Sequence, residues 1–383
     1  MSRTVKTATA LLCLMALPAA ADLPFGAQDI ENATFSEKTT TTAPQPAPAE
    51  NTGTAAATDI QSMALEALSD PQIGEPSQHQ TKPTEQKTDT GLPDDRSALA
   101  AKVQILLDRA GISPGVIDGY SGGMSETALR AFEARAGLPQ DGKLDREVWT
   151  ALGGDVASGL TTVHTISEDD LAGLSAAPLP DDYADLAKLD QIGFTSVAEK
   201  LAERYHMDEE FLRALNPGIA WQIGETITVM NPQAPTPTGT VARIVVDKAN
   251  SRLRALSADG AVITDYPVTV GSSDTPSPNG TVAINAVAID PTYSYNPDVN
   301  FKQGDNTEPL TLPPGPNGPV GSVWIDLDKP TYGLHGTPYP DKLFTNQSHG
   351  CVRLTNWDVT ELAEMVSATL STDHAPVMVE FME

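Results

Sequence analysis

The sequence predicts a multidomain chain with an all-α module of three helices, a small α+β module and a mainly β C-terminal domain. The chain has 383 residues, more than one hydrophobic core usually organises, so two or three domains are expected. Apolar residues at helical spacing run through residues 97–152, whereas β-rich runs dominate residues 240–381. Polar and proline-rich stretches separate these parts, as linkers between domains do.

The N-terminus has the pattern of an export signal. Arg3 and Lys6 give a positive start, an apolar run covers residues 8–17, and three alanines at residues 19–21 form a small-residue cleavage site. The run is too short to cross a bilayer, and no later stretch reaches 18 consecutive apolar residues. We therefore expect a signal peptide over residues 1–21, a mature protein in the periplasm and no membrane span.

The composition argues against nucleic acid and anionic membranes as partners. Asp and Glu outnumber Lys and Arg by 51 to 24, which gives a formal net charge of −27. The two cysteines are Cys13, inside the expected signal peptide, and Cys351. Removal of the signal peptide would leave Cys351 as a lone thiol in an oxidising compartment, and such a thiol suggests a chemical role.

Residues 22–96 are expected to be a disordered linker. Thr, Ala, Pro, Gln and Glu dominate this stretch, and Phe25 and Phe35 are its only aromatic residues. Such a composition buries too little apolar surface to offset the chain entropy that folding removes.

Three helices are expected within residues 97–152. In the first helix, apolar residues that include Val103 and Leu106 share one face. Two Asp-Gly turns, at residues 118–119 and 141–142, separate the three helices.

A polar, acidic linker over residues 153–188 leads to a second small module over residues 189–231. Its expected order is helix, helix, strand, with Asp208 capping the second helix and alternation over residues 226–229 predicting the strand. Three prolines in residues 232–239 form a stiff linker to the last domain.

The domain over residues 240–381 is expected to be an antiparallel sheet or barrel with one late helix. Turns rich in Asn, Asp, Gly, Ser and Pro separate its β-rich runs. The expected strands cover residues 242–247, 252–256, 261–270, 281–290 and 376–381, and the expected helix covers residues 356–367.

The residues that suggest chemistry lie in two segments of this domain, 332–337 (Tyr-Gly-Leu-His-Gly-Thr) and 348–354 (Ser-His-Gly-Cys-Val-Arg-Leu). His335 and Cys351 are sixteen positions apart. A free thiol is only a few per cent thiolate at neutral pH, so a nucleophilic cysteine needs an imidazole or a cation beside it. The N–H groups of Gly350 and Cys351 can in addition stabilise an oxyanion, so the two segments are suited to acyl transfer.

Two other interpretations of these segments remain open. Cys351 could be a structural cysteine in a core strand, although its Ser, His and Gly neighbours are poor core residues. One cysteine and two histidines could also bind zinc, but the fourth ligand would have to come from a distant residue such as Asp358 or His374.

Residues 240–381 resemble the catalytic domain of the L,D-transpeptidase (YkuD) family. That family has a histidine followed by Gly-Thr, then a loop, and then Ser-His-Gly-Cys-x-Arg, a pattern that this chain matches from His335 to Arg353. Pro278 and Gly280 also keep the frame of the family's Thr-Pro-x-Gly loop.

The upstream modules resemble domains that bind the cell wall. Residues 97–152 are similar to a small helical peptidoglycan-binding domain, in their Val-Ile-Asp-Gly-Tyr and Leu-Pro-Gln-Asp-Gly turns among other pieces. Residues 189–231 resemble a LysM module, except that Gly193-Phe194-Thr195 replaces the usual Gly-Asp-Thr. Glycan binding and a spacer role both remain open for this module.

The L,D-transpeptidase resemblance implies a role for each residue of the motif. Cys351 is the expected nucleophile and His335 the general base and acid, with the Gly336 carbonyl orienting the imidazole. Arg353 either binds a carboxylate of the substrate or forms an ordinary salt bridge, and both readings remain open. The residues expected to shape the site and its oxyanion hole are Gly336, Ser348, His349 and Gly350.

The same resemblance implies a reaction without a cofactor or metal. The donor is a tetrapeptide stem of peptidoglycan, whose acyl group passes through a thioester on the cysteine. The acceptor is an amine of another stem or of an envelope protein, or water in a carboxypeptidase or endopeptidase side activity. A catalytically inactive scaffold that binds peptidoglycan is the alternative function.

Overall fold

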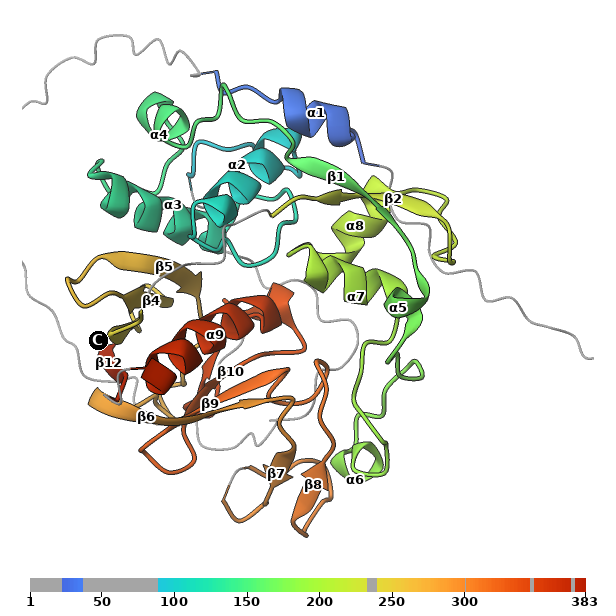
Figure 1. The fold of residues 1–383 in the computed structure, drawn as a ribbon, viewed down its shortest axis with the longest axis vertical. Coiled ribbons are helices and arrows are strands. Elements are labelled where there is room, and N and C mark those ends of the chain that lie inside the picture. Colours follow the sequence, from blue (N-terminus) through green and yellow to red (C-terminus); the bar gives the residue numbers. More distant parts are fainter. Residues whose placement is uncertain (1–22, 37–88, 233–239, 300, 345–347, 373–375) are drawn as a thin grey trace, which may run out of the picture.

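A computed structural model describes residues 23–36, 89–232, 240–299, 301–344, 348–372 and 376–383 (Figure 1). The expected signal peptide and most of the expected disordered and proline-rich linkers lie outside these residues. In Figure 1 the helical module lies above the large sheet, and the second small module lies beside both.

The C-terminal domain is built on an eight-stranded mixed sheet, which confirms a mainly β fold with one long helix. The strand order is β11-β10-β9-β6-β12-β3-β4-β5, and all neighbours are antiparallel except β10–β11 and β12–β3. The strands are β3 (Arg243–Asp247), β4 (Arg252–Leu256), β5 (Val262–Pro267), β6 (Gly280–Ile289), β9 (Val323–Leu327), β10 (Gly333–His335), β11 (Val352–Arg353) and β12 (Met378–Met382).

The helix α9 (Asn356–Thr372) covers one face of this sheet (Figure 1). Its residues Val359, Leu362 and Val366 are fully buried at helical spacing and share one core with the sheet residues Ile325 and Leu334. A short hairpin of β7 (Tyr293–Tyr295) and β8 (Leu310–Leu312) stands apart from the main sheet.

The expected three-helix module consists of α2 (Ala98–Arg109), α3 (Gly123–Ala136) and α4 (Arg146–Ala151). Ser97 caps α2, since its side chain accepts a hydrogen bond from the Ala100 N–H at 3.1 Å. The core of the module gathers around Trp149, which is fully buried.

The second module contains the expected α7 (Val197–Arg204), α8 (Glu209–Leu215) and β2 (Thr226–Met230). The expectation that residues 153–188 only link domains is wrong, because β1 (Thr161–Thr165) pairs antiparallel with β2 along its whole length. Three of the five β1 residues are threonines, so the strand lacks the apolar alternation that would have predicted it. The same segment holds α5 (Glu168–Leu171) and α6 (Tyr183–Leu186).

A second correction concerns the start of the expected disordered segment. Residues 23–36 contain α1 (Ala27–Asn32), and Ile30 is fully buried against α2 and the second module. The Lys102 Nζ donates hydrogen bonds to two carbonyls of this segment. The composition argument was wrong here because it counts only the apolar surface that a segment buries against itself, whereas this segment docks on a core made by other residues.

The three folded parts are joined by backbone contacts. Ser113, which follows α2, donates its N–H to the Asp265 carbonyl of β5 at 2.8 Å, and the Arg252 guanidinium bonds both residues. Ile117 in turn donates to the His206 carbonyl of the second module at 2.8 Å. In the part of the chain that the structure describes, no helix is long and apolar enough to cross a membrane.

The docking of α1 predicts the effect of a mutation outside every recognised domain. Ile30→Ala should lower the free energy of unfolding by about 2 to 5 kcal/mol, as is typical when a buried isoleucine is truncated. Val156→Ala is the control, since Val156 is 84% exposed and its truncation should cost less than about 0.5 kcal/mol. Chemical denaturation of both variants measures the difference, and an unchanged stability of Ile30→Ala would contradict the docked position of α1.

Candidate functional site

The parallel pairing of β10 and β11 brings the two halves of the expected catalytic motif together. Leu334 lies opposite Val352, and His335 lies opposite Arg353. Cys351 directly precedes β11, where the Gly333 backbone hydrogen bonds the sulfur and the thiol lies 3.6 Å from the Thr331 carbonyl. The cysteine therefore lies beside Gly333, two residues before the histidine on the neighbouring strand, although a loop separates Cys351 from His335 in the sequence.

His335 is buried, with 4% of its surface exposed, and its tautomer is fixed by the backbone. Its Nδ1 lies 2.7 Å from the Gly336 carbonyl oxygen, which can only accept, so Nδ1 carries the proton. In the neutral ring, Nε2 is then the nitrogen that can take up a proton. The Trp324 ring of β9 stacks on the imidazole, with ring centroids 5.5 Å apart and planes 20° apart.

Burial keeps both expected catalytic groups uncharged in the resting site. Burial and the nearby Arg353 charge lower the pKa of His335 to about 3, against an opposing effect of the Gly336 carbonyl. Burial also raises the pKa of the Cys351 thiol, although the Gly333 hydrogen bond and the Arg353 charge act in the opposite direction. A neutral thiol and a neutral imidazole are the resting forms at neutral pH.

The loop before Cys351 is shaped by Ser348 and Gly350. The Ser348 hydroxyl donates to the Cys351 carbonyl and accepts from the Gly350 N–H at 3.1 Å. Gly350 has a φ of +109°, and a Cβ there would lie 2.7 Å from the Tyr332 ring, so only glycine fits. The expected oxyanion role of the Gly350 N–H is thus not supported, because in this structure that group is bonded inside the loop.

His349 and Arg353 flank the cysteine in the sequence, each two positions from it. His349 is exposed, and its ring stacks on Phe301 with centroids 4.7 Å apart and planes 11° apart. The backbone of Arg353 pairs with Thr269, while its side chain interacts electrostatically with Cys351, Tyr183 and Tyr293. The guanidinium thus lies within electrostatic reach of the thiol.

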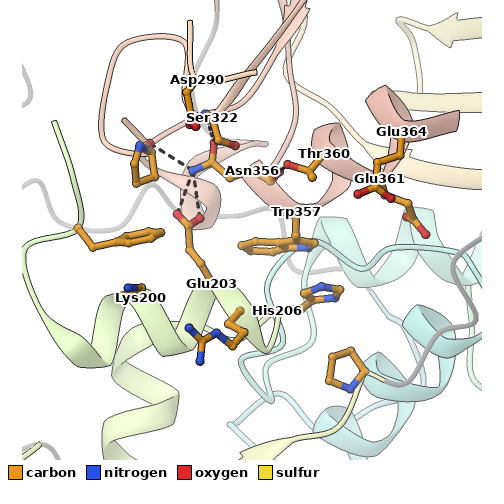
Figure 2. A pocket seen from close by; sticks show the side chains of 14 residues that line it. Lys200, Glu203, His206, Asp290, Ser322, Asn356, Trp357, Thr360, Glu361 and Glu364 are labelled. Carbon is orange, nitrogen blue, oxygen red and sulfur yellow. Dashed lines mark hydrogen bonds between the residues drawn. The ribbon is translucent and has the colours of Figure 1, made fainter. Parts of the chain in front are cut away.

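Asn356 packs against Gly336, whose carbonyl orients the imidazole of His335, and Figure 2 shows its hydrogen bonds to neighbouring residues. A Cβ at Gly336 or at Gly321 would lie 2.1 Å from Asn356 Oδ1, so the amide is packed directly against both glycines. The same oxygen accepts the Ser322 N–H at 3.1 Å. The Asn356 Nδ2 donates to both carboxylate oxygens of Glu203 at 3.1 and 3.0 Å.

Glu203 belongs to α7, so the second module contributes to the support of the catalytic domain. Burial raises the pKa of Glu203 to about 8, against the lowering effect of the Asn356 hydrogen bonds. Glu203 and Asn356 both line a pocket of 630 Å³ between α7 and α9. Figure 2 shows the two side chains in direct hydrogen-bond contact, and the Trp357 ring stacks on that of His206.

The zinc interpretation finds no support among the described residues, where no group of three or more His, Cys, Asp or Glu is arranged to hold a metal ion. Asp358 instead accepts a hydrogen bond from the Ser113 hydroxyl at 2.9 Å, at the junction with the helical module. His374 lies outside the described residues.

Sequence reasoning missed three residues around this site. Trp324 is one member of an alternating strand, Asn356 was only the first residue of an expected helix, and Glu203 lies in another module. None of them belongs to the motif, so only their positions in the folded chain identify them.

Comparisons with known proteins agree with this geometry. Residues 241–379 match the "L,D-transpeptidase catalytic domain" family, and residues 96–152 match the "Putative peptidoglycan binding domain" family. The chain is 30% identical over 169 residues to "Putative L,D-transpeptidase YkuD" of Bacillus licheniformis, a match that covers 44% of this chain and 87% of that relative.

Two further matches are more partial. "Probable L,D-transpeptidase YbiS" of Escherichia coli is 30% identical over 200 residues, which cover 49% of this chain and 65% of that protein. A solved L,D-transpeptidase from Mycobacterium smegmatis is 17% identical with a TM-score of 0.30, and the match covers 43% of this chain and 76% of that one. Because the chain spans most of the Bacillus licheniformis relative at 30% identity, it belongs to the L,D-transpeptidase family.

Proposed function

We propose that this L,D-transpeptidase works through an acyl-enzyme on Cys351, with His335 as its general base and acid. The observation that carries the proposal is the 2.7 Å contact from His335 Nδ1 to the Gly336 carbonyl, on a strand paired with the one that follows Cys351. This contact leaves Nε2 to accept the thiol proton. Trp324 and the surrounding burial exclude water from the imidazole and hold it in one orientation.

The proposed reaction is acyl transfer in two steps. The Cys351 sulfur attacks the carbonyl of the third, diamino-acid residue of a tetrapeptide stem, His335 takes the thiol proton and passes it to the leaving amine, and D-Ala departs. An amine then attacks the thioester and loses its proton to His335, the carbon–sulfur bond breaks as the new amide forms, and the leaving Cys351 sulfur takes the proton back from His335. The N–H of Cys351 is the proposed oxyanion donor, and Ser348, Gly350 and His349 shape the loop that presents it.

Arg353 is the proposed binding residue for a carboxylate of the anionic donor stem. Its planar guanidinium can hold such a group through two hydrogen bonds, close to the sulfur on which its charge acts. The acceptor is an amine of a second stem, which gives a cross-link, or an amine of an envelope protein, which gives anchoring. Water as the acceptor gives a carboxypeptidase or endopeptidase side activity.

The remaining parts of the chain support a proposed location of this reaction at the cell wall. Residues 1–21 are the proposed signal peptide for export to the periplasm, because they combine a positive start with an apolar run and a small-residue cleavage site. The helical module over residues 97–152 is the proposed wall anchor, and residues 189–231 stay a predicted LysM-like module. The catalytic domain is assigned to residues 240–381.

Replacing the nucleophile tests the proposal against an inactive scaffold. Cys351→Ser should make no product from purified muropeptides, since a serine hydroxyl is not acidic enough to replace the thiol beside a neutral imidazole. Mass analysis of the muropeptides after incubation with either protein identifies donor, acceptor and hydrolysis products together. Circular dichroism controls for folding, and turnover by Cys351→Ser equal to that of the wild type would refute the mechanism.

The charge state of the site predicts an unusual pH profile. Between pH 5 and 8 the wild-type rate of Cys351 acylation should be nearly constant, because His335 deprotonates near pH 3 and the thiol titrates above its ordinary range. His335→Ala should lower the rate roughly 100- to 10,000-fold. The remaining rate should rise about tenfold per pH unit, because it depends on the free thiolate.

The matched variant for this pH experiment is His349→Ala. It removes an exposed ring that stacks on Phe301, so it should slow acylation far less than His335→Ala and keep the flat profile. Single-turnover acylation by a tetrapeptide donor measures both variants. A step in the wild-type acylation rate near pH 6.5 would contradict the assignment of His335 as the general base. A loss of the flat profile in His349→Ala but not in His335→Ala would reverse the roles of the two histidines.

Asn356 offers a test of how the base is held. Asn356→Ala removes the amide that packs against Gly336, so the imidazole should lose its fixed orientation, and kcat should fall roughly 10- to 100-fold with little change in KM. Thr360→Ala is the control, since Thr360 lines the same pocket and its hydroxyl donates to the main-chain carbonyl of Asn356, not to the side-chain amide. Equal kcat values for the two variants would show that Asn356 does not position His335.

A further inference from the structure

A segment outside the catalytic domain packs against the edge of the proposed active site. Residues 179–192 precede the matched region by about fifty positions in the sequence and contain α6. Together with the β7–β8 hairpin they form a separate apolar core, in which Leu186 and Ile192 lie against Tyr295 and Leu312. Figure 1 shows α6 beside β8, far from the rest of the second module.

Hydrogen bonds fix the start of this segment to the loop between β7 and β8. Gln303 of that loop accepts the Tyr183 N–H at 3.1 Å and donates from Nε2 to the Asp181 carbonyl at 3.0 Å. The Gln303 N–H also donates to the Tyr295 hydroxyl at 2.9 Å. One glutamine, only 9% exposed, thus joins the segment to both strand and loop of the hairpin.

The end of the segment is fixed as firmly. The Ile192 N–H donates to the Pro314 carbonyl at 2.8 Å, and the Ile192 carbonyl accepts from the Asn317 N–H at 3.1 Å. A Cβ at Gly315 would lie 2.1 Å from the Ile192 oxygen, so the two backbones are in direct contact. With both ends attached, the segment cannot move without the hairpin.

Tyr183 is the centre of an aromatic cluster that reaches the cysteine loop. Its ring meets those of Tyr293, Tyr295 and Phe301 edge to face, with centroids 6.1, 5.2 and 6.1 Å away. Phe301 in turn stacks on His349, two residues before Cys351. The position of the cysteine loop is therefore linked through two ring contacts to a tyrosine from outside the catalytic domain.

The polar end of Tyr183 lies within the field of Arg353. The Arg353 charge acts on the Tyr183 phenol, and Tyr183 and Tyr293 both act on the guanidinium. Burial raises the pKa of Tyr183, so its hydroxyl keeps its proton and can donate a hydrogen bond at any working pH.

We propose that Tyr183 is a specificity-determining residue of the donor site, where its hydroxyl and Arg353 together bind a carboxylate of the peptide stem. The inference rests on the proposed acyl-enzyme function and deepens it. The segment over residues 179–192 is then a wall of the substrate site that holds the β7–β8 hairpin in place. The site is complete only when this segment accompanies the catalytic domain.

The test is the donor KM of Tyr183→Phe in the full-length mature protein. This variant keeps the ring contacts and removes the hydroxyl, so KM for a tetrapeptide donor should rise about tenfold, as expected for a lost hydrogen bond to a charged group, with kcat little changed. Alkylation of Cys351 by iodoacetamide, which carries no carboxylate, should stay within about twofold of the wild-type rate. Tyr205→Phe, which loses a hydroxyl bonded to His164 in the second module, is the matched control and should keep the wild-type KM.

A donor whose stem carboxylate has been converted to a carboxamide gives the second arm. With this donor, wild type and Tyr183→Phe should have the same KM, because the group that the hydroxyl binds has been removed. An unchanged KM in Tyr183→Phe would overturn the proposal while normal turnover leaves the acyl-enzyme mechanism standing. Faster turnover by Tyr183→Ala would overturn it too, since the segment would then block the site. A wild-type protein that is alkylated but makes no product would refute the proposed function and this inference with it.

Discussion

The parallel pairing of β10 and β11 is the constraint on which the site depends. It sets His335 opposite Arg353 and places Cys351 immediately before β11, beside Gly333. The loop between the two strands carries the chain back to start β11 in the same direction, and Ser348 and Gly350 give this loop the turn it needs. If the register shifted by one residue, His335 would face the other side of the sheet, and the motif residues would no longer lie together.

Burial from water sets the protonation states of His335 and Cys351. A buried imidazole beside Arg353 stays neutral, and a partly buried thiol stays protonated, so the resting site holds no ion pair between the two groups. In the proposed mechanism, charge separates only when the thiol attacks, and at that moment Arg353, the Gly333 backbone and the fixed Nδ1–H of His335 are already in position. The arrangement favours the charged transition state without stabilising a charged ground state.

The second module and the segment around Tyr183 both contact residues that support the site. Glu203 of the second module bonds Asn356 behind the imidazole, while Gln303 attaches the hairpin near Tyr183. Glu203 lies in α7 and Tyr183 in α6, two stretches that both precede the catalytic domain in the sequence. The second module and the segment around Tyr183 are therefore joined to the proposed catalytic site through partly buried hydrogen bonds.

The sequence was enough to predict the catalytic domain and its motif, because both are local. The β4 strand was expected at its observed bounds, and His335, Gly336 and Cys351 form a pattern with fixed spacing. The docked helix around Ile30, the strand β1 and the helix at Tyr183 could not be predicted. Each of them is polar or short by itself and becomes ordered on a surface that residues far away in the sequence create.

The most direct test of the central claim is to trap the acyl-enzyme. The wild-type protein is mixed with a tetrapeptide donor that has its own amine blocked, quenched in acid and digested for peptide mapping by mass spectrometry. The account predicts a thioester on Cys351 whose added mass equals the mass of the donor minus that of free D-Ala, and which disappears when an acceptor amine is added before the quench. Donor consumption without any adduct on Cys351, or an adduct on another residue, would contradict it.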